Sequence, residues 1–396
     1  MEPLETIFIV HEYYQQPGGE DQVFAAESDL LEASGCRVVR YTDHNDRVKD
    51  VGSLALARAT VWNGTAYRTL RKLFREEAPQ IVHFHNTFPL ISPAAYYAAR
   101  AEGVPVVQTL HNYRLFCTNS LFFRDGHVCE DCFGRTLPWP GVIHSCYRGS
   151  PAASGTVAVM LTAHRALRTW TRMVDMYIAL TEFAREKFIQ GGLPAEKVAV
   201  KPHFVHPDPG PGEGRGGYAL FVGRLSPEKG SKTLLSAWEH LGGRLPLKIV
   251  GDGPLAPQTA AAVRQVPEVE WLGQLPLEEV YKLMGEAAFL VFPSEWYETF
   301  GRVAIEAFAR GTPVVASKIG AIAELVEHGR TGLHFRPGDP KDLAAQIEWA
   351  LKHPADLKQM RKEARADFTA KYTAGRNYES LMEIYQTAAE RVKERA

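Results

Sequence analysis

The arrangement of apolar residues is the feature that most constrains the fold of this chain. Short apolar runs of strand length alternate with segments of helical spacing from one end to the other. In the first half the runs cover residues 6–10, 36–41, 80–85, 105–110, 175–180 and 198–201, and in the second half residues 218–222, 247–250, 269–272, 289–292 and 313–316. Because helices between strands provide crossover connections, this order predicts an α/β protein with parallel sheets.

A segment rich in proline and glycine, residues 207–217, separates the two sets of strands. A chain of 396 residues exceeds one ordinary hydrophobic core, so we expect two domains. The predicted boundaries are residues 1–205 for the first domain, 206–217 for the linker, 218–373 for the second domain, and 374–396 for a last helix that crosses back to the first domain. Two doubly wound, Rossmann-like sheets are expected to face a central cleft at the carboxyl ends of their strands.

The composition describes a globular protein without an evident polyanionic partner. Hydrophobic residues make up 45% of the chain, and the formal net charge is -1. A charge balance this close to neutrality argues against a general nucleic-acid binder. The N-terminal residues lack the basic region of a signal peptide, and no apolar run approaches the about 20 residues of a membrane span. We therefore expect cytoplasmic residence.

Two glutamates bracket the most informative stretch of the second half. Glu298 follows the apolar run 287–292, whereas Glu306 falls inside a helical pattern. Phe300 and Gly301 would offer backbone N–H groups at the helix start, where partial positive charge suits a phosphate. A carboxylate accepts hydrogen bonds from vicinal hydroxyls, so one glutamate can hold a ribose and the other a hexose. Such a spacing alone describes an ordinary loop and helix, but the flanking strands favour a sugar-nucleotide site.

Two further loops follow strands of the second half. One begins at Gly223 and carries Arg224 and Lys229, and the other contains Gly251 and Gly253. A guanidinium binds phosphate oxygens in a fork and an ammonium supplies a point charge, so the two cations can neutralise a leaving diphosphate. A solvated charged loop is the plain alternative. Because both loops open at the same edge of a sheet, we favour a ligand.

Polar and glycine residues also follow strands of the first half. Gly18 and Gly19 follow the first strand and can admit a phosphate or sugar close to the backbone. They are not a dinucleotide fingerprint, since G-x-G-x-x-G between a strand and a helix occurs nowhere. His111 ends the fourth strand in a His-Asn-Tyr-Arg turn, and we expect it to act directly in the cleft. For His83 and His85 we expect packing or supporting roles.

Four of the five cysteines fall in residues 113–150, which we expect to be an insertion in the first domain. They are Cys117, Cys129, Cys132 and Cys146, and the spacing of the middle two is common at structural zinc. In a cytosolic chain a metal is favoured over disulfides. The outer spacings match no zinc signature, so three interpretations stay open: structural zinc, reduced thiols in a packed insertion, and a redox role.

The segment 156–173 has the spacing of one helix and carries Arg165, Arg168 and Arg172 without an acidic residue. Such a helix suits an anionic membrane surface or an acceptor lipid diphosphate. The plain alternative is an amphipathic helix that packs on its own domain and leaves a solvated basic face.

With these residues in place, the chain resembles glycosyltransferase family 4, the retaining enzymes with the GT-B fold, over nearly its whole length. The resemblance rests on residues 221–230, 250–254, 298–306 and 311–317, which occur in the family's order. In the first half, Gly18, Gly19 and His111 fall where the family places its flexible glycine loop and its cleft histidine. The segment with the cysteines is not part of the family's general pattern.

The resemblance implies that the second domain holds a nucleotide-sugar donor and the first domain holds the acceptor. Glu306 would contact the ribose, and Glu298 the sugar. Catalytic roles are predicted for Arg224, Lys229, His111 and Glu298. Donor binding is predicted for Gly18, Gly19, Gly223, Gly251, Gly253, Phe300, Gly301 and Glu306.

The expected activity is transfer of a hexosyl group, with retention, from a nucleoside-diphosphate sugar to a carbohydrate or polyprenyl-linked acceptor in cell-envelope or exopolysaccharide synthesis. No D-x-D motif is evident, so we expect catalysis without a divalent ion and no cofactor besides the structural zinc. Peripheral contact with the inner face of a membrane is a further expectation, and nucleic acid is not an expected partner. A nucleotide-sugar epimerase, a phosphorylase and a non-catalytic sugar-nucleotide scaffold remain the alternatives.

Overall fold

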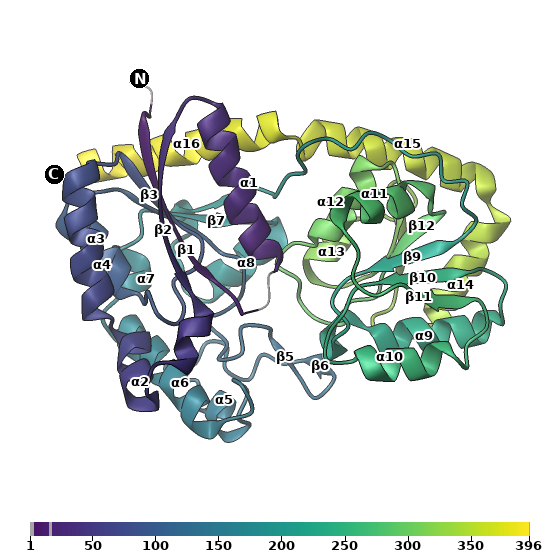
Figure 1. Cartoon of the computed structure of the whole chain (residues 1–396), viewed down its shortest axis with the longest axis horizontal. Coiled ribbons are helices and arrows are strands. Elements are labelled where there is room, and N and C mark those ends of the chain that lie inside the picture. The colour runs from purple at the N-terminus through teal and green to yellow at the C-terminus, as the bar shows by residue number, and fades with distance from the viewer. Residues whose placement is uncertain (1–3, 16–17, 396) are drawn as a thin grey trace. The chain divides into compact units, whose positions relative to one another are not determined.

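The computed structural model describes residues 4–15 and 18–395 (Figure 1). The chain divides into two compact units. Unit 1 contains the described residues up to 122, residues 130–201 and residues 377–395, and unit 2 contains residues 123–129 and 202–376. The division falls at Lys201 and Pro202, a few residues before the predicted linker.

Unit 1 is built on a six-stranded sheet in which every pairing is parallel. Its strands, in spatial order, are β2 (Arg37–His44), β1 (Thr6–Tyr13), β3 (Ile81–Phe84), β4 (Val106–Thr109), β7 (Met176–Ala179) and β8 (Val198–Val200). The helices of unit 1 are α1 (Gly19–Ala33), α2 (Ser53–Val61), α3 (Gly64–Glu77), α4 (Ala94–Ala101), α5 (Trp139–Ile143), α6 (Pro151–Ala166), α7 (Thr169–Arg172), α8 (Glu182–Gln190) and most of α16 (Ala374–Lys393).

Unit 2 repeats this design with a second parallel sheet of six strands. Its strands, in spatial order, are β11 (Val269–Trp271), β10 (Leu247–Val250), β9 (Ala219–Val222), β12 (Phe289–Phe292), β13 (Val314–Ser317) and β14 (Gly332–Phe335). Its helices are α9 (Ser231–Leu241), α10 (Ala256–Val263), α11 (Leu277–Glu286), α12 (Arg302–Ala309), α13 (Gly320–Leu325), α14 (Pro340–Lys352) and α15 (Pro354–Lys371). A short antiparallel hairpin, β5 (Phe123–Arg124) with β6 (His127–Val128), is grouped with this unit.

The central strands are apolar because helices cover both faces of each sheet. Ile7, Phe8, Ile9 and Val10 of β1 are all inaccessible to solvent, and β12 and β13 are buried along their whole length. Parallel sheets require this double covering, and continuous apolar runs are its sequence signature. The predicted strands are therefore present in both units, with ends that differ by a few residues.

Two expectations about local structure are corrected. The single helix predicted over residues 156–173 is two helices, α6 and α7, because Arg168 between them adopts a left-handed backbone with φ of 55°. Residues 332–335 form β14, a strand that the sequence pattern missed.

The predicted linker, residues 206–217, contains no helix or strand but is hydrogen-bonded to unit 2 along most of its length. The amides of Gly212, Gly214 and Gly216 donate to backbone carbonyls of Arg310, Gly285 and Glu286 at 2.8–2.9 Å. The segment is therefore part of the surface of unit 2, fixed by ordinary backbone hydrogen bonds.

The interior of unit 2 centres on Trp238 of α9. This side chain is fully buried, and its indole Nε1 donates to the carbonyl of Leu245 at 2.8 Å. The indole packs among side chains of the sheet and of α14, in a core that includes Phe289, Leu333 and Leu343.

Trp238→Ala is expected to lower the free energy of unfolding by about 3–5 kcal/mol, because it removes a large buried ring and leaves a cavity. The matched control is Trp349→Ala, which removes a tryptophan of α14 that is 37% exposed. We expect the control to cost less than about 1 kcal/mol. Urea titration followed by circular dichroism compares the two, and equal losses would contradict this description of the core.

Candidate functional site

The strand order of unit 2 reverses between β9 and β12. The chain moves outward from β9 through β10 to β11, and then returns to the other side of β9 with β12. The loops that follow these two central strands therefore diverge at the carboxyl edge of the sheet. Sheets of this type bind ligands at such a switch point.

Glycines let the loops of this edge pack directly on one another. Gly230 has φ of +71°, and a Cβ there would lie 1.9 Å from the carbonyl oxygen of Pro293 in the loop after β12. Gly251 has φ of +135°, and its Cβ would lie 1.9 Å from the carbonyl oxygen of Gly223. No other residue type fits either position without moving the backbone. The loops after β9, β10 and β12 are thus one rigid assembly.

Lys229 and Glu298 meet inside this assembly. The Nζ of Lys229 lies 2.5 Å from Oε1 of Glu298, and the hydroxyl of Ser294 donates to the same oxygen at 2.8 Å. The ammonium also lies over the rings of Phe292 and Trp296, at 5.9 and 5.3 Å from their centroids. Glu298 is buried and Lys229 is half-buried, so the pair is screened by solvent only on one side. Sequence reasoning brought these two residues to the same edge but did not predict their contact.

The second glutamate of the motif lies in α12, as predicted. Glu306 is buried, and its Oε1 lies 3.1 Å from Nε of Arg302 one turn earlier. Burial raises the pKa of Glu306, and the neighbouring guanidinium opposes that rise. Gly301 precedes the helix with φ of +122°, and Phe300 is buried beside it. The first N–H groups of α12 therefore begin next to the loop that holds Glu298.

Arg224 lies on the same loop as Lys229 and is exposed. The structure therefore brings the predicted cations, both glutamates and the glycines of the second half to one edge of unit 2. Their roles toward a donor stay predictions.

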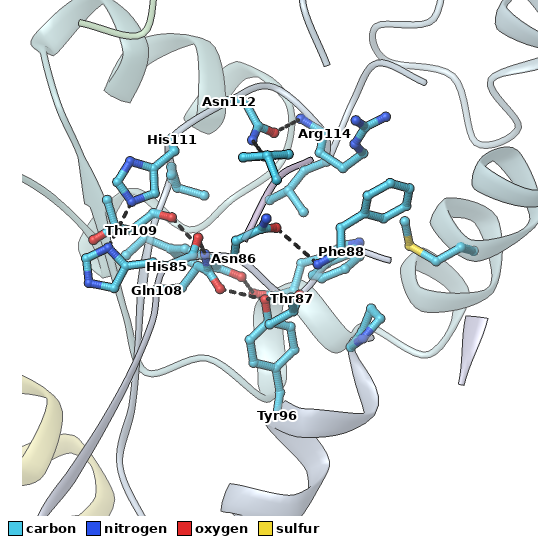
Figure 2. A pocket seen from close by; sticks show the side chains of 17 residues that line it. His85, Asn86, Thr87, Phe88, Tyr96, Gln108, Thr109, His111, Asn112 and Arg114 are labelled. Atoms are coloured by element: carbon cyan, nitrogen blue, oxygen red, sulfur yellow. Dashed lines mark hydrogen bonds between the residues drawn. The ribbon is translucent and has the colours of Figure 1, made fainter. Parts of the chain in front are cut away.

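A pocket lies at the corresponding edge of unit 1, beyond the ends of β3 and β4 (Figure 2). Its cavity volume is about 70 Å³, and the hollow around it opens to solvent. Polar groups from two strand ends line it, among them Asn86, Gln108, His111 and Arg114. Apolar lining comes from Phe88, Met160 and Trp170. The pocket thus has the mixed lining of a small-molecule site.

The predicted histidine lies in this pocket and is held by another imidazole. His111 Nε2 is 3.0 Å from Nδ1 of His85, and the two rings stack with centroids 5.2 Å apart (Figure 2). Burial, together with nearby imidazoles and the ammonium of Lys201, holds the pKa of His111 and of His85 well below the usual range. Both rings are therefore neutral at physiological pH. The supporting role expected for His85 agrees with this geometry.

Arg114 is held between aromatic rings at the mouth of the same pocket. Its guanidinium carbon lies 4.4 Å from the ring centroid of Phe88 and 5.0 Å from that of Tyr147. Its Nη1 donates to the carbonyl of Thr118. A guanidinium fixed in this way offers its remaining N–H groups in a defined plane.

Gly18 and Gly19 lie where α1 begins. The amide of Gly18 donates to Oδ2 of Asp21 at 2.8 Å, and Oδ1 of Asp21 lies 2.7 Å from Nε2 of His11. Next to them the hydroxyl of Tyr14 donates to Glu20 at 3.0 Å. Burial raises the pKa of Glu20 to about 8, so this carboxyl holds a proton at neutral pH.

The four cysteines predicted to bind zinc form no disulfide in the described part of the chain. Cys117 and Cys132 are buried, and Cys129 and Cys146 are half-buried. The thiol of Cys117 donates to Oδ1 of Asn119 at 2.8 Å, and that of Cys132 to the carbonyl of Pro138 at 3.8 Å. Binding of a structural zinc by these four cysteines stays a prediction. Metal analysis of the purified protein tests it, and the absence of stoichiometric zinc would reject it.

Several residues of the unit 1 pocket were not found by sequence reasoning. Tyr14, Tyr96, Gln108 and Thr109 carry no motif, and only the position of Gln108 and Thr109 at a strand end could have indicated them. Glu20 directly follows Gly18 and Gly19, but no sequence pattern indicated its role.

Comparison with known proteins identifies the family. The model named Glycosyl transferases group 1 matches residues 211–367, and the model named Glycosyl transferase 4-like domain matches residues 17–203. A 2-deoxystreptamine glucosyltransferase of Streptomyces kanamyceticus is 31% identical over 342 residues, which cover 83% of this chain and 83% of that protein. Glycogen synthase of Mycobacterium tuberculosis is 28% identical over 385 residues, which cover 90% of this chain and 81% of that protein.

Solved structures agree on the fold. HepE of Anabaena, crystallised with UDP and glucose, matches with a TM-score of 0.67 and 19% identity, over 98% of this chain and 100% of that chain. The two six-stranded parallel sheets and the matches in both halves lead to one assignment. The chain belongs to glycosyltransferase family 4 and has the GT-B fold.

Proposed function

We propose that this glycosyltransferase moves a hexosyl group, with retention, from a nucleoside-diphosphate sugar to a carbohydrate or polyprenyl-linked acceptor in cell-envelope or exopolysaccharide synthesis. The observation that carries the proposal is the Lys229–Glu298 pair at the switch point of unit 2. The binding of UDP and glucose by HepE supports a donor of this class.

The transition state of glycosyl transfer is oxocarbenium-like, so negative charge builds on the departing diphosphate. Lys229 meets that charge with an ammonium whose position is fixed before the reaction, because Glu298 and two aromatic rings hold it. Arg224 on the same loop adds a fork of donors. The first N–H groups of α12 contribute partial positive charge.

These groups support catalysis without a divalent ion at the donor. The acceptor hydroxyl would attack the face of the sugar that the diphosphate leaves, and a departing phosphate oxygen would take its proton. Glu306 would accept hydrogen bonds from the ribose hydroxyls. The pocket of unit 1, with His111, Asn112 and Arg114, suits the polar end of the acceptor.

The experiment that tests the proposal is a thermal-shift panel of UDP-, GDP- and ADP-sugars, followed by product analysis with candidate acceptors. A transferase releases nucleoside diphosphate only when an acceptor is supplied. Isomerised donor without acceptor would indicate an epimerase, sugar phosphate formed with inorganic phosphate would indicate a phosphorylase, and donor binding without turnover would indicate a scaffold.

Lys229→Ala and Arg224→Ala are each expected to lower kcat by roughly 10²-fold or more, the scale of losing one donor to the transition state. The matched control is Lys352→Ala at the exposed end of α14, which should leave kcat unchanged. Steady-state release of nucleoside diphosphate measures all three. Near-normal turnover in both site variants would reject the assignment of the cations.

Glu306→Ala is expected to raise the donor Kd by roughly tenfold or more, since it removes charge-assisted hydrogen bonds to the ribose. Glu306→Gln keeps the shape of the buried side chain and should weaken binding in the same direction. Glu279→Ala, on the exposed face of α11, is the control. Titration calorimetry with the best donor measures Kd, and an unchanged value in both Glu306 variants would contradict the ribose contact.

We also propose that unit 1 touches an anionic membrane surface. In the described residues no helix is long and apolar enough to cross a bilayer. However, α2, α5 and α6, which pack together, carry large apolar side chains that are 41–68% exposed on the helices and the turns beside them: Leu54, Trp62, Leu137, Trp139, Ile143, Val159 and Leu167. Arg168 and Arg172 are exposed near this apolar surface. Arg165 is not available for contact with an anionic lipid, because its guanidinium donates to the backbone carbonyls of Leu115 and Thr136.

The double variant Ile143→Ser with Leu167→Ser is expected to lose most of its cosedimentation with phosphatidylglycerol vesicles, because apolar insertion and charge act together. Leu277→Ser in unit 2, whose leucine is 47% exposed, serves as the control and should bind normally. Equal binding of the wild type to phosphatidylglycerol and phosphatidylcholine vesicles would contradict the proposed preference for an anionic membrane surface.

A further inference from the structure

A buried ion pair lies below the pocket of unit 1. Lys201, which follows β8, places its Nζ 2.5 Å from Oε1 of Glu27 in α1, and each side chain is only 1% exposed. A carboxylate at this depth is retained because the ammonium and further polar groups compensate its lost hydration. Its second oxygen is therefore the informative atom.

Oε2 of Glu27 faces His85. It lies 3.5 Å from Nε2 of that imidazole. Both atoms are buried, and in the described part of the chain neither has a hydrogen-bond partner of standard geometry. Each is therefore the natural partner of the other, and a shift of a few tenths of an ångström would give an ordinary hydrogen bond.

This contact determines which nitrogen of His85 carries the proton. A lone pair on Nε2 would point at a carboxylate oxygen and be repelled, whereas an Nε2–H group is attracted by it. Nδ1 of His85 is then an acceptor, and the nitrogen 3.0 Å away, Nε2 of His111, must be the donor. In His111 the remaining nitrogen, Nδ1, becomes an acceptor.

We infer that His85 is a positioning residue: Glu27 fixes its tautomer, and His85 in turn fixes His111 as the Nε2–H tautomer, so that His111 accepts a hydrogen bond from a ligand hydroxyl through Nδ1. The group that contacts Nδ1 of His111 is then a hydroxyl that donates a hydrogen bond, and not an anion. Its ligand part rests on the proposed function, but the tautomer part does not.

A metal ion is the competing explanation of the same cluster. Glu27, His83 and His85 have ligand atoms within 4.8 Å of one another. Both nitrogens of His83, however, are already engaged, Nδ1 with the hydroxyl of Tyr385 at 2.8 Å and Nε2 with that of Thr109 at 2.7 Å. The ammonium of Lys201 already neutralises Glu27. Only one imidazole nitrogen and one oxygen would remain for a metal, which is short of a closed site.

The test is long-range proton–nitrogen NMR correlation on the full chain labelled with ¹⁵N-histidine, which identifies the protonated nitrogen of each neutral ring. In the wild type, His85 and His111 are both expected as Nε2–H tautomers. His85→Leu, which removes the acceptor, should turn His111 into a mixture of tautomers. His85→Asn places an amide oxygen near the position of Nδ1 and should restore the Nε2–H form.

The matched control is His83→Leu. It removes a buried imidazole whose ring centroid lies 4.3 Å from that of His85 but whose two nitrogens contact the hydroxyls of Tyr385 and Thr109, so the tautomer of His111 should not change. A wild-type His111 protonated on Nδ1, or a tautomer that His85→Leu leaves unchanged, would overturn the inference. Stoichiometric binding of zinc that shifts the NMR signals of His83 and His85 would overturn it as well.

Turnover separates this inference from the proposed function. With a working donor and acceptor, His85→Leu should lower kcat/KM by roughly tenfold, the value of one neutral hydrogen bond, and His85→Asn should recover most of it. If the tautomers are as expected but no sugar nucleotide is turned over, the proposed function fails and the positioning role stands. If transfer proceeds and His111 does not respond to His85→Leu, the positioning role fails.

Discussion

The reversal of strand order inside each sheet is the constraint on which the remaining structure depends. In unit 1 it falls between β1 and β3, and in unit 2 between β9 and β12. Crossover helices must leave such neighbouring strands in opposite directions, so the loops after them separate and the backbone at the carboxyl edge is left open. In both units the polar and charged groups of the candidate sites collect there. On this fold the residues of these loops therefore determine the chemistry of the site more than the sheet does.

The two units use this opening differently. In unit 2, Gly230 and Gly251 lie so close to carbonyl oxygens of neighbouring loops that no side chain would fit there. The Lys229–Glu298 ion pair lies on these tightly packed loops. Unit 1 keeps a hollow and surrounds it with imidazoles, amides and a guanidinium. A charged, preformed surface suits a phosphate, whose geometry is constant. A polar hollow with neutral rings suits hydroxyl groups, whose pattern differs from one sugar to another.

Much of this architecture was predictable because parallel strands are buried on both faces and so appear as unbroken apolar runs. The loop position of Glu298 and the helical position of Glu306 followed from the runs that flank them. What the sequence did not reveal depends on distant residues. Glu27 and Lys201 are 174 positions apart, and His83 and Tyr385 are 302 apart, so no local pattern connects them. The break at Arg168 was missed because arginine carries no signal for a left-handed backbone. The strand at residues 332–335 was missed because glycine and histidine interrupt its apolar character.

Unit 1 is assembled from distant parts of the chain, since residues 377–395 of α16 belong with residues from the first half. Tyr385 reaches His83 from that helix, and Arg395 pairs with the buried Asp175. On the ribosome the first sheet emerges long before these residues are made, and its interior therefore stays incomplete until α16 has been synthesised. The second half, which is nearly continuous, can fold first. The packing below the pocket of unit 1 is thus completed late, although the pocket residues are among the earliest of the two units to be synthesised.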